Sequence, residues 1–336
     1  MKFHGKTFVK KLIVVLAAGS VFAAMALACS QTEKPQAPAL NTATKLVVGQ
    51  NQNYFPIITA HVKGFFKEEF GDRFTVEVPK FANGPAQAEA LTSKQIDLGN
   101  MGDMPIVQVR ANNVDIKVIS YLWESPDGYY LLVNKNSGIK SPADLRGKKV
   151  GIAIGTNMHK LLFKYLGVEK IKASEVEIVN LDTAGSVSAV TEGLIDATVL
   201  AEPMRSRLLA TGKVAEAASA QGYDKIVTLL YGRTEYLQQN PDIVARYLKV
   251  IDRANRWVAE NVDEAVKIVA DYMGTTDLEG TRQYYDTHVF KIAAGKDLVD
   301  LLKGTIAFCY SQGTITEEFK AEDLVDSSYV KAAGLE

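Results

Sequence analysis

Cysteine and an excess of either charge are what this sequence has least of. Only two cysteines occur in 336 residues, Cys29 and Cys309, so a framework of several disulfides is excluded. The 38 basic and 39 acidic residues leave a formal net charge of −1, which provides no basic surface for nucleic acid. Cys309 stands between Phe308 and Tyr310 in a segment with helical spacing, which predicts a buried thiol rather than a nucleophile.

Sequence motifs of catalysis are missing as well. The chain contains no Gly-x-Ser-x-Gly, no phosphate-binding loop ending in Gly-Lys-Ser/Thr and no His-Glu-x-x-His. His61, His159 and His288 lie far apart, with no cysteine or carboxylate at ligand spacing, so we expect no metal site and no cofactor. With 47% hydrophobic residues the chain can still bury a sizeable core. We therefore expect a binding protein rather than an enzyme.

The first 44 residues read as an export signal followed by a tether. Residues 1–28 contain a basic start, an apolar stretch and the small-residue exit Ala26-Leu27-Ala28, which together are typical of a signal peptide. Cys29 follows directly and resembles the lipidated cysteine of bacterial lipoproteins, although the same exit also suits ordinary cleavage. Residues 29–44, with Pro35 and Pro38, predict a flexible linker. We expect an exported protein, in the periplasm or on the outer face of the cytoplasmic membrane, held by a lipid at Cys29.

The rest of the chain alternates strands and helices, which predicts an α/β fold. A strand at 45–48 precedes a helix at 57–70, and the alternation continues to a strand at 116–120. It begins again with a strand at 129–133, and a helical C-terminal tail follows from residue 234. We predict two lobes with mixed, mostly parallel sheets, the first formed by 45–128 plus 225–336 and the second by 129–224. Such sheets bind ligands beyond the carboxyl ends of their strands.

The turns at those strand ends are rich in amides, glycine and helix-start residues. In Gly99-Asn100-Met101-Gly102-Asp103-Met104-Pro105 we expect a strand end, a tight glycine turn, and a helix that Asp103 caps and Pro105 opens. The turn Gly155-Thr156-Asn157-Met158-His159 also follows a strand and opens a helix, with Thr156 as its cap. Several helix N-termini would then face one cleft, where their free N–H groups suit an anion.

These segments resemble periplasmic binding proteins for aliphatic sulfonates, taurine and nitrate. The similarity is carried by the two turns above, by Ala82-Asn83-Gly84-Pro85, by the segment 141–150 and by Asp196 to Pro203. It implies a type II Venus-flytrap receptor, expected as a monomer, that hands its solute to an ABC permease and its ATPase. A small organic anion such as an alkanesulfonate or taurine is the implied ligand. Nitrate, a thiamine-precursor pyrimidine and a sensor role without transport remain alternatives.

The resemblance and the strand-end rule together select the candidate ligand-binding residues. An aromatic residue often precedes the Glu/Asp-Pro pair in this family, whereas Leu200 and Ala201 stand there in this chain. Glu202 is expected either to pair with an ammonium group of the ligand or to cap its own helix, and Glu124 either to face an amine of the ligand or to face water. Trp123 either packs on an alkyl chain of the ligand or lies in the core. The candidates are Gln52, Asn53, Tyr54, Asn83, Gly84, Gly102, Asp103, Met104, Trp123, Thr156, Asn157, Met158, His159 and Glu202.

Overall fold

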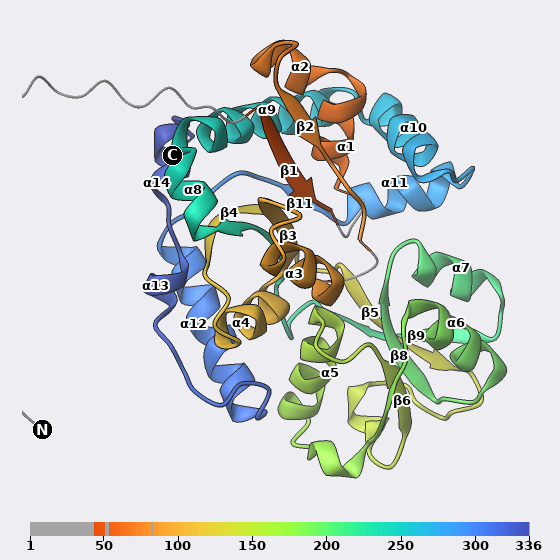
Figure 1. The fold of residues 1–336 in the computed structure, drawn as a ribbon. Helices are drawn as coiled ribbons and strands as arrows, with labels where there is room; N and C mark the ends of the chain where they lie inside the picture. The colour runs from red at the N-terminus through yellow and green to blue at the C-terminus, as the bar shows by residue number, and fades with distance from the viewer. Residues whose placement is uncertain (1–43, 51–53, 82–83, 336) are drawn as a thin grey trace, which may run out of the picture. The chain divides into compact units, whose positions relative to one another are not determined.

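Two mixed β-sheets with helices packed on them form the described part of the chain (Figure 1). The computed structural model describes residues 44–50, 54–81 and 84–335, without the side chain of Pro85. The predictions for Cys29, for the signal peptide and for most of the linker therefore concern residues outside the described ones. Among the described residues, no helix combines the length and the apolar content that a bilayer crossing requires.

The first sheet has six strands in the order β11-β4-β10-β3-β1-β2. Its centre is apolar on both faces, as in β1 with Leu46, Val47 and Val48 buried, because helices cover both sides. The pairs β1–β2 and β1–β3 are parallel, whereas β10 runs antiparallel to both of its neighbours. The strands are β1 (Lys45–Gly49), β2 (Thr75–Glu77), β3 (Leu98–Gly102), β4 (Ile116–Ser125), β10 (Ile226–Arg233) and β11 (Val289–Phe290).

The second sheet has five strands in the order β7-β6-β8-β5-β9. The pairs β6–β7 and β6–β8 are parallel, and β5 runs antiparallel between β8 and β9. The strands are β5 (Tyr129–Asn134), β6 (Lys149–Ile152), β7 (Glu177–Asn180), β8 (Ala197–Ala201) and β9 (Val214–Ser219).

Each sheet contains one strand that the chain forms on arriving from the other half of the molecule. The chain leaves the six-stranded sheet after β4 and enters the other as β5, and it returns from β9 as β10. Each entering strand is inserted antiparallel beside the parallel strands. Five of the nine described strand pairings are consequently antiparallel, a larger share than the strand–helix alternation predicts. The predicted α/β class with two mixed sheets is confirmed.

The helices before β10 follow the predicted spacing with two differences. The helix expected at 57–70 is divided at Gly64, whose φ of +77° only glycine adopts readily and which ends the first helical run. The expected glycine turn after residue 98 is instead the end of β3, which continues to Gly102. The helices are α1 (Phe55–Val62), α2 (Phe65–Phe70), α3 (Gly84–Thr92), α4 (Asp103–Ala111), η1 (Pro142–Leu145), α5 (Asn157–Val168), η2 (Ala173–Glu175), α6 (Thr183–Glu192) and α7 (Met204–Ala210).

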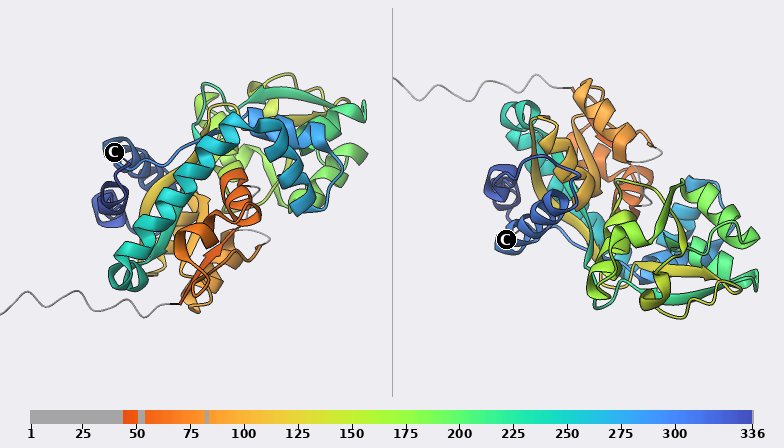
Figure 2. Two further views of the ribbon diagram at one scale, coloured as in Figure 1. Left: turned by 90° about the horizontal axis from the view of Figure 1, so that it is seen from above. Right: turned by 90° about the horizontal axis from the view of Figure 1, so that it is seen from below.

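The C-terminal segment is helical apart from β11, and it packs mainly on the six-stranded half. The long amphipathic α9 lies along α1 and α2, and α12 packs on α4 (Figure 2). Cys309 of α12 is buried, as predicted. The tail helices are α8 (Thr234–Gln239), α9 (Pro241–Glu260), α10 (Val262–Met273), α11 (Leu278–Asp286), α12 (Lys296–Ser311), α13 (Ala321–Leu324) and α14 (Ser328–Ala332).

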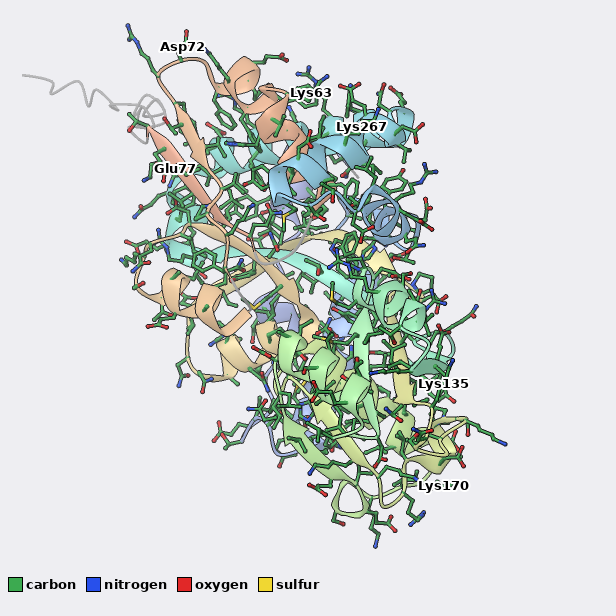
Figure 3. All side chains as sticks on the ribbon, turned by 90° about the vertical axis from the view of Figure 1, so that its right-hand side faces the viewer. Lys63, Asp72, Glu77, Lys135, Lys170 and Lys267 are labelled. Atoms are coloured by element: carbon green, nitrogen blue, oxygen red, sulfur yellow. The ribbon has the colours of Figure 1, made fainter. Side chains whose placement is uncertain are left out.

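Apolar side chains of both sheets belong to one buried cluster. This cluster contains Ile119 and Leu122 of β4 together with Leu131 and Val133 of β5. Figure 3 shows lysines such as Lys267 on the exterior, on α10. This buried cluster therefore continues from one sheet into the other where the chain passes from β4 to β5.

Candidate ligand-binding cavity

A cavity of about 390 Å³ lies where the ends of both sheets meet. The starts of five helices contribute to its wall: Gly84 for α3, Gly102 for α4, Asn157 for α5, Thr183 for α6 and Met204 for α7. The lining residues are Gly84, Met101, Gly102, Pro105, Trp123, Tyr129, Ala153, Gly155, Thr156, Asn157, Met158, Asp182, Thr183, Leu200, Ala201, Glu202, Met204, Tyr284 and His288.

The turn before α5 is the most fully organised of these helix starts. Thr156 is the N-cap, as predicted: its Oγ1 accepts the His159 N–H at 3.3 Å and donates to the Ala153 carbonyl at 2.6 Å. The Nδ1 of His159 accepts the Gly155 N–H at 3.3 Å, and burial lowers the pKa of this imidazole. His159 therefore supports the turn as a neutral ring. The N–H groups of Asn157 and Met158 lie in the first turn of α5, where no intrahelical partner exists.

Asn157 links this turn to the six-stranded half. Its Oδ1 accepts the Met104 N–H at 3.4 Å, and its Nδ2 donates to the Val227 carbonyl at 3.1 Å. Gly102 permits the approach, because a Cβ built there would lie 2.3–2.4 Å from the Asn157 amide. The sequence predicted a close approach at this glycine, and the structure shows that the approaching group is a side chain of the other half.

Asp103 does not cap α4, which corrects the prediction. Gly102 is the N-cap residue, and the buried Asp103 carboxylate turns toward Lys160 of α5, whose Nζ lies 2.6 Å from Oδ2. Thr305 of α12 donates to the same oxygen at 2.5 Å, and Asp224 lies 2.9 Å from the Lys160 ammonium. A buried lysine requires such partners, and this requirement outweighs the local capping preference of an aspartate.

Two carboxylates line the cavity, and both already serve helix starts. Glu202 accepts the N–H and the hydroxyl of Ser206, at 3.1 and 3.0 Å, and pairs with Arg205 at 3.0 Å. Asp182 is the N-cap of α6 and accepts the Gly185 N–H at 2.7 Å. Of the two roles expected for Glu202, the structure shows the capping role, because its carboxylate accepts the Ser206 N–H in the first turn of α7. No lysine or arginine belongs to the described lining.

Glu124 lies away from the cavity lining and pairs with two lysines. Its Oε2 is 2.5 Å from the Lys225 ammonium and 2.6 Å from that of Lys291. Burial raises the pKa of this carboxyl, but the two lysines outweigh burial and hold the pKa below its ordinary value. Glu124 is therefore a carboxylate with lysine partners of its own.

Aromatic side chains form one wall of the cavity. The rings of Trp123 and His288 meet edge to face with centroids 4.3 Å apart, and Tyr284 stacks on His288 at 4.0 Å. Tyr129 completes this wall, and burial raises its pKa to about 12. We define the aromatic wall as Trp123, Tyr129, Tyr284 and His288. Sequence reasoning selected only Trp123, because Tyr284 and His288 follow no strand end of the second lobe and no local pattern brings α11 to the site.

The candidate residues separate into three groups. Gly84, Gly102, Trp123, Thr156, Asn157, Met158 and Glu202 line the cavity. Tyr54, Asp103, Met104 and His159 are buried but do not belong to its lining; the hydroxyl of Tyr54, for instance, donates to Asn255 at 3.3 Å. Gln52, Asn53 and Asn83 lie outside the described residues. Sequence reasoning missed Asp182 and Thr183, although they follow strand β7 and the same strand-end rule would have found them.

A family model described as "NMT1/THI5 like" matches residues 51–265, which is more than half of the chain. The chain belongs to this family. This NMT1/THI5-like protein is 29% identical over 295 residues to a Bacillus subtilis (strain 168) protein named for binding aliphatic sulfonates, covering 85% of this chain and 87% of that protein. It is 28% identical over 227 residues to the taurine-binding periplasmic protein of Escherichia coli (strain K12), covering 67% and 68% of the two chains.

The NMT1/THI5-like chain also shares its fold with solved binding proteins. The periplasmic aliphatic sulphonate binding protein SsuA from Escherichia coli superposes with a TM-score of 0.76 at 21% identity, covering 87% of this chain and 100% of that one. The resemblance to sulfonate- and taurine-binding proteins that the turn segments indicated is thereby confirmed. Among the described residues of the chain, no group of three or more His, Cys, Asp or Glu is placed to hold a metal ion.

Proposed function

We propose that this chain is an exported solute receptor that binds a small organic anion and delivers it to an ABC importer. The observation that carries this proposal is the convergence of five helix starts on one cavity whose described lining has no lysine or arginine. Each helix N-terminus is worth about half a positive charge, and a nearby anion gains about 0.3–1 kcal/mol from it. Uncharged donors bind an anion without leaving a buried cation unpaired when the ligand departs, which suits a carrier.

In this proposal the anionic group lies at the start of α5. The N–H groups of Asn157 and Met158 would donate to it, and the Gly102 side of α4 would close over it. Gln52, Asn53 and Asn83 belong to the same proposal through the strand-end rule.

Lobe 1, 45–128 plus 225–336, and lobe 2, 129–224, would close on the ligand, and the closed monomer would engage the permease and its ATPase. The names of the relatives support an alkanesulfonate- or taurine-like anion.

Calorimetry with a panel of ligands tests the proposal. The purified chain without residues 1–28 is titrated with ethanesulfonate, taurine, nitrate and a thiamine-precursor pyrimidine, with choline as the cationic control. We expect an organic anion to bind and choline not to bind. Binding of choline alone would contradict the proposal. Binding of the pyrimidine alone would assign the cavity to that alternative, and no binding by any of them would favour the sensor.

Replacing Gly102 with alanine tests the contact between the two halves. The added methyl would displace the Asn157 amide and weaken its bonds to Met104 and Val227, so we expect organic-anion affinity to fall by about 1–3 kcal/mol. Gly167→Ala on the same helix as Asn157 is the control, because a Cβ there meets no atom within 4 Å. Equal affinities of the two variants would show that Asn157 does not shape the site.

We propose lipidation at Cys29 as the means of attachment. Expression of the full chain with labelled palmitate should label the wild type and leave Cys29→Ala unlabelled and released from membranes. Cys309→Ala, which removes the buried thiol, is the matched control and should label as the wild type does. A labelled Cys29→Ala variant would remove this part of the proposal.

A further inference from the structure

Helix α11 is attached to the six-stranded half at its C-terminal end. The Thr287 carbonyl, just after the helix, accepts the Ser125 hydroxyl at the end of β4, and β11 then pairs with β4. Tyr284 and Tyr285 pack on Phe55 of α1, with ring centroids 6.2 and 5.5 Å from that of the phenylalanine. The six-stranded half therefore carries α11.

The N-terminal end of the same helix contacts α7 of the five-stranded half (Figure 1). Asp277 is the N-cap of α11, and its Oδ2 accepts hydrogen bonds from Nε and Nη2 of Arg207 at 3.1 and 2.9 Å. Gly280 lies so close to Pro203, the residue before α7, that a Cβ built on the glycine would be 2.8 Å from the proline Cβ. Helix α11 thus bridges the two halves.

The face of α11 that contacts α7 also lines the cavity. Gly280 and Tyr284 are four positions apart, so they lie on the same face of the helix. Tyr284 lines the cavity, and so do Glu202 and Met204 around the start of α7. A ligand in the cavity is therefore bounded on this side by two helices that touch each other.

The ion pair between these helices is strong enough to favour the contact and weak enough to be released. The Gly280 N–H and the Arg207 guanidinium lower the pKa of Asp277, so its carboxylate is charged at neutral pH. The side chain of Arg207 is 50% exposed and that of Asp277 is 32% exposed. An ion pair with this exposure adds a small stabilisation that salt screens. Such a contact suits a closure that opens again for each solute.

We propose that α11 is a latch in which the Arg207–Asp277 pair sets how fast a bound anion leaves the cavity. The release of an anion rests on the proposed function, whereas the contact between α11 and α7 does not. Moving α11 away from α7 opens this side of the cavity and separates the two charges, so release on this side requires the pair to break. Loss of the pair should therefore appear in the dissociation rate.

Replacing Asp277 with asparagine tests the latch, because it removes the charge but keeps an N-cap acceptor for the Gly280 N–H. In stopped-flow measurements with ethanesulfonate, and with taurine as a second probe, we expect release about threefold faster than from the wild type, as for a partly exposed ion pair. Asp286→Asn is the matched control and should keep the wild-type rate, because Asp286 pairs with Arg282 of the same helix. In roughly 1 M salt the wild-type rate should approach that of Asp277→Asn.

A measurement without ligand tests the contact separately from the proposed function. Spin labels at Lys267→Cys on α10 and Lys135→Cys after β5, in a Cys29→Ser background, report the separation of the two halves. Both lysines are exposed (Figure 3). We expect Asp277→Asn to broaden the distribution of label distances and shift it to longer values, and Asp286→Asn to leave it as in the wild type.

The possible outcomes separate the latch from the proposed function. If ethanesulfonate or taurine binds, the rates decide: equal release from Asp277→Asn and Asp286→Asn would overturn the latch and leave the proposed function standing. Adding Arg207→Gln to Asp277→Asn should not speed release further, because one substitution already removes the pair. If no organic anion binds, the proposed function fails and the label distances decide. An unchanged distribution in Asp277→Asn would then overturn the latch.

Discussion

Replacing Lys160 with methionine should lower the free energy of unfolding by about 3–5 kcal/mol. Lys160 is 3% exposed and its ammonium lies 2.6 Å from Asp103 and 2.9 Å from Asp224. Methionine fills similar space but leaves two carboxylates without their cation, and a carboxylate buried without a partner is strongly destabilising. Urea unfolding monitored by circular dichroism at neutral pH measures the loss.

A control variant and a double variant make this prediction specific. Lys267→Met makes the same chemical change on the exposed face of α10 and should change stability by less than about 0.5 kcal/mol (Figure 3). Adding Asp103→Leu to Lys160→Met removes one stranded carboxylate, so the double variant should be more stable than Lys160→Met alone. A loss below about 1 kcal/mol for Lys160→Met would show that the ion cluster does not hold the halves together.

The two carboxylates also decide the charge state of Lys160. Burial lowers the pKa of its ammonium, but the charges of Asp103 and Asp224 outweigh burial and raise the pKa above the ordinary lysine value. A raised lysine pKa stabilises the fold fully below the unfolded-state pKa, and that contribution is lost as the pH rises through the folded-state pKa. Lys160 therefore stays protonated across the physiological range, so the charge of the ion cluster does not change with pH in that range.

Acidification should destabilise the wild type through His288 by about 3 kcal/mol. Burial lowers the pKa of this imidazole from 6.5 to about 4, with a smaller opposing effect from the hydrogen bond to the Tyr284 carbonyl. Between these two pH values the unfolded chain binds a proton that the folded chain excludes. The contribution is therefore complete above about pH 6.5 and is lost as the pH falls through about 4, at about 1.4 kcal/mol per pKa unit.

Unfolding measured at several pH values, without ligand, isolates this contribution. The difference in unfolding free energy between the wild type and His288→Gln should decrease by about 3 kcal/mol from pH 7 to pH 4. His159 and the carboxylates are present in both proteins and cancel in that difference. His61→Gln, at an exposed position of α1, is the control and should follow the wild type. A constant difference for His288→Gln would contradict burial as the cause.

The local part of the site could be predicted because its determinants are neighbours in the sequence. Thr156 caps α5 through the N–H three residues later, and this contact is local and recurs in many helices. The strand-end rule placed Gly84, Gly102 and Glu202 on the same cavity for a similar reason. By contrast, the Ala-rich strand β9 has a weak intrinsic preference for a strand and forms through its pairing with β5, so no pattern in residues 214–219 indicates it.

The sequence alone determined the α/β class, the two-sheet plan, the amide-rich helix starts and the family. Each depends on residue spacings of a few positions or on motifs read along the chain. Only the tertiary structure decided that Asp103 pairs with Lys160 and with Thr305, which is 202 positions away, and that Tyr284 of α11 and His288 just after it line the cavity. Burial makes the difference: a buried charge or donor needs a partner from whichever segment the fold brings near, and local patterns do not specify that segment.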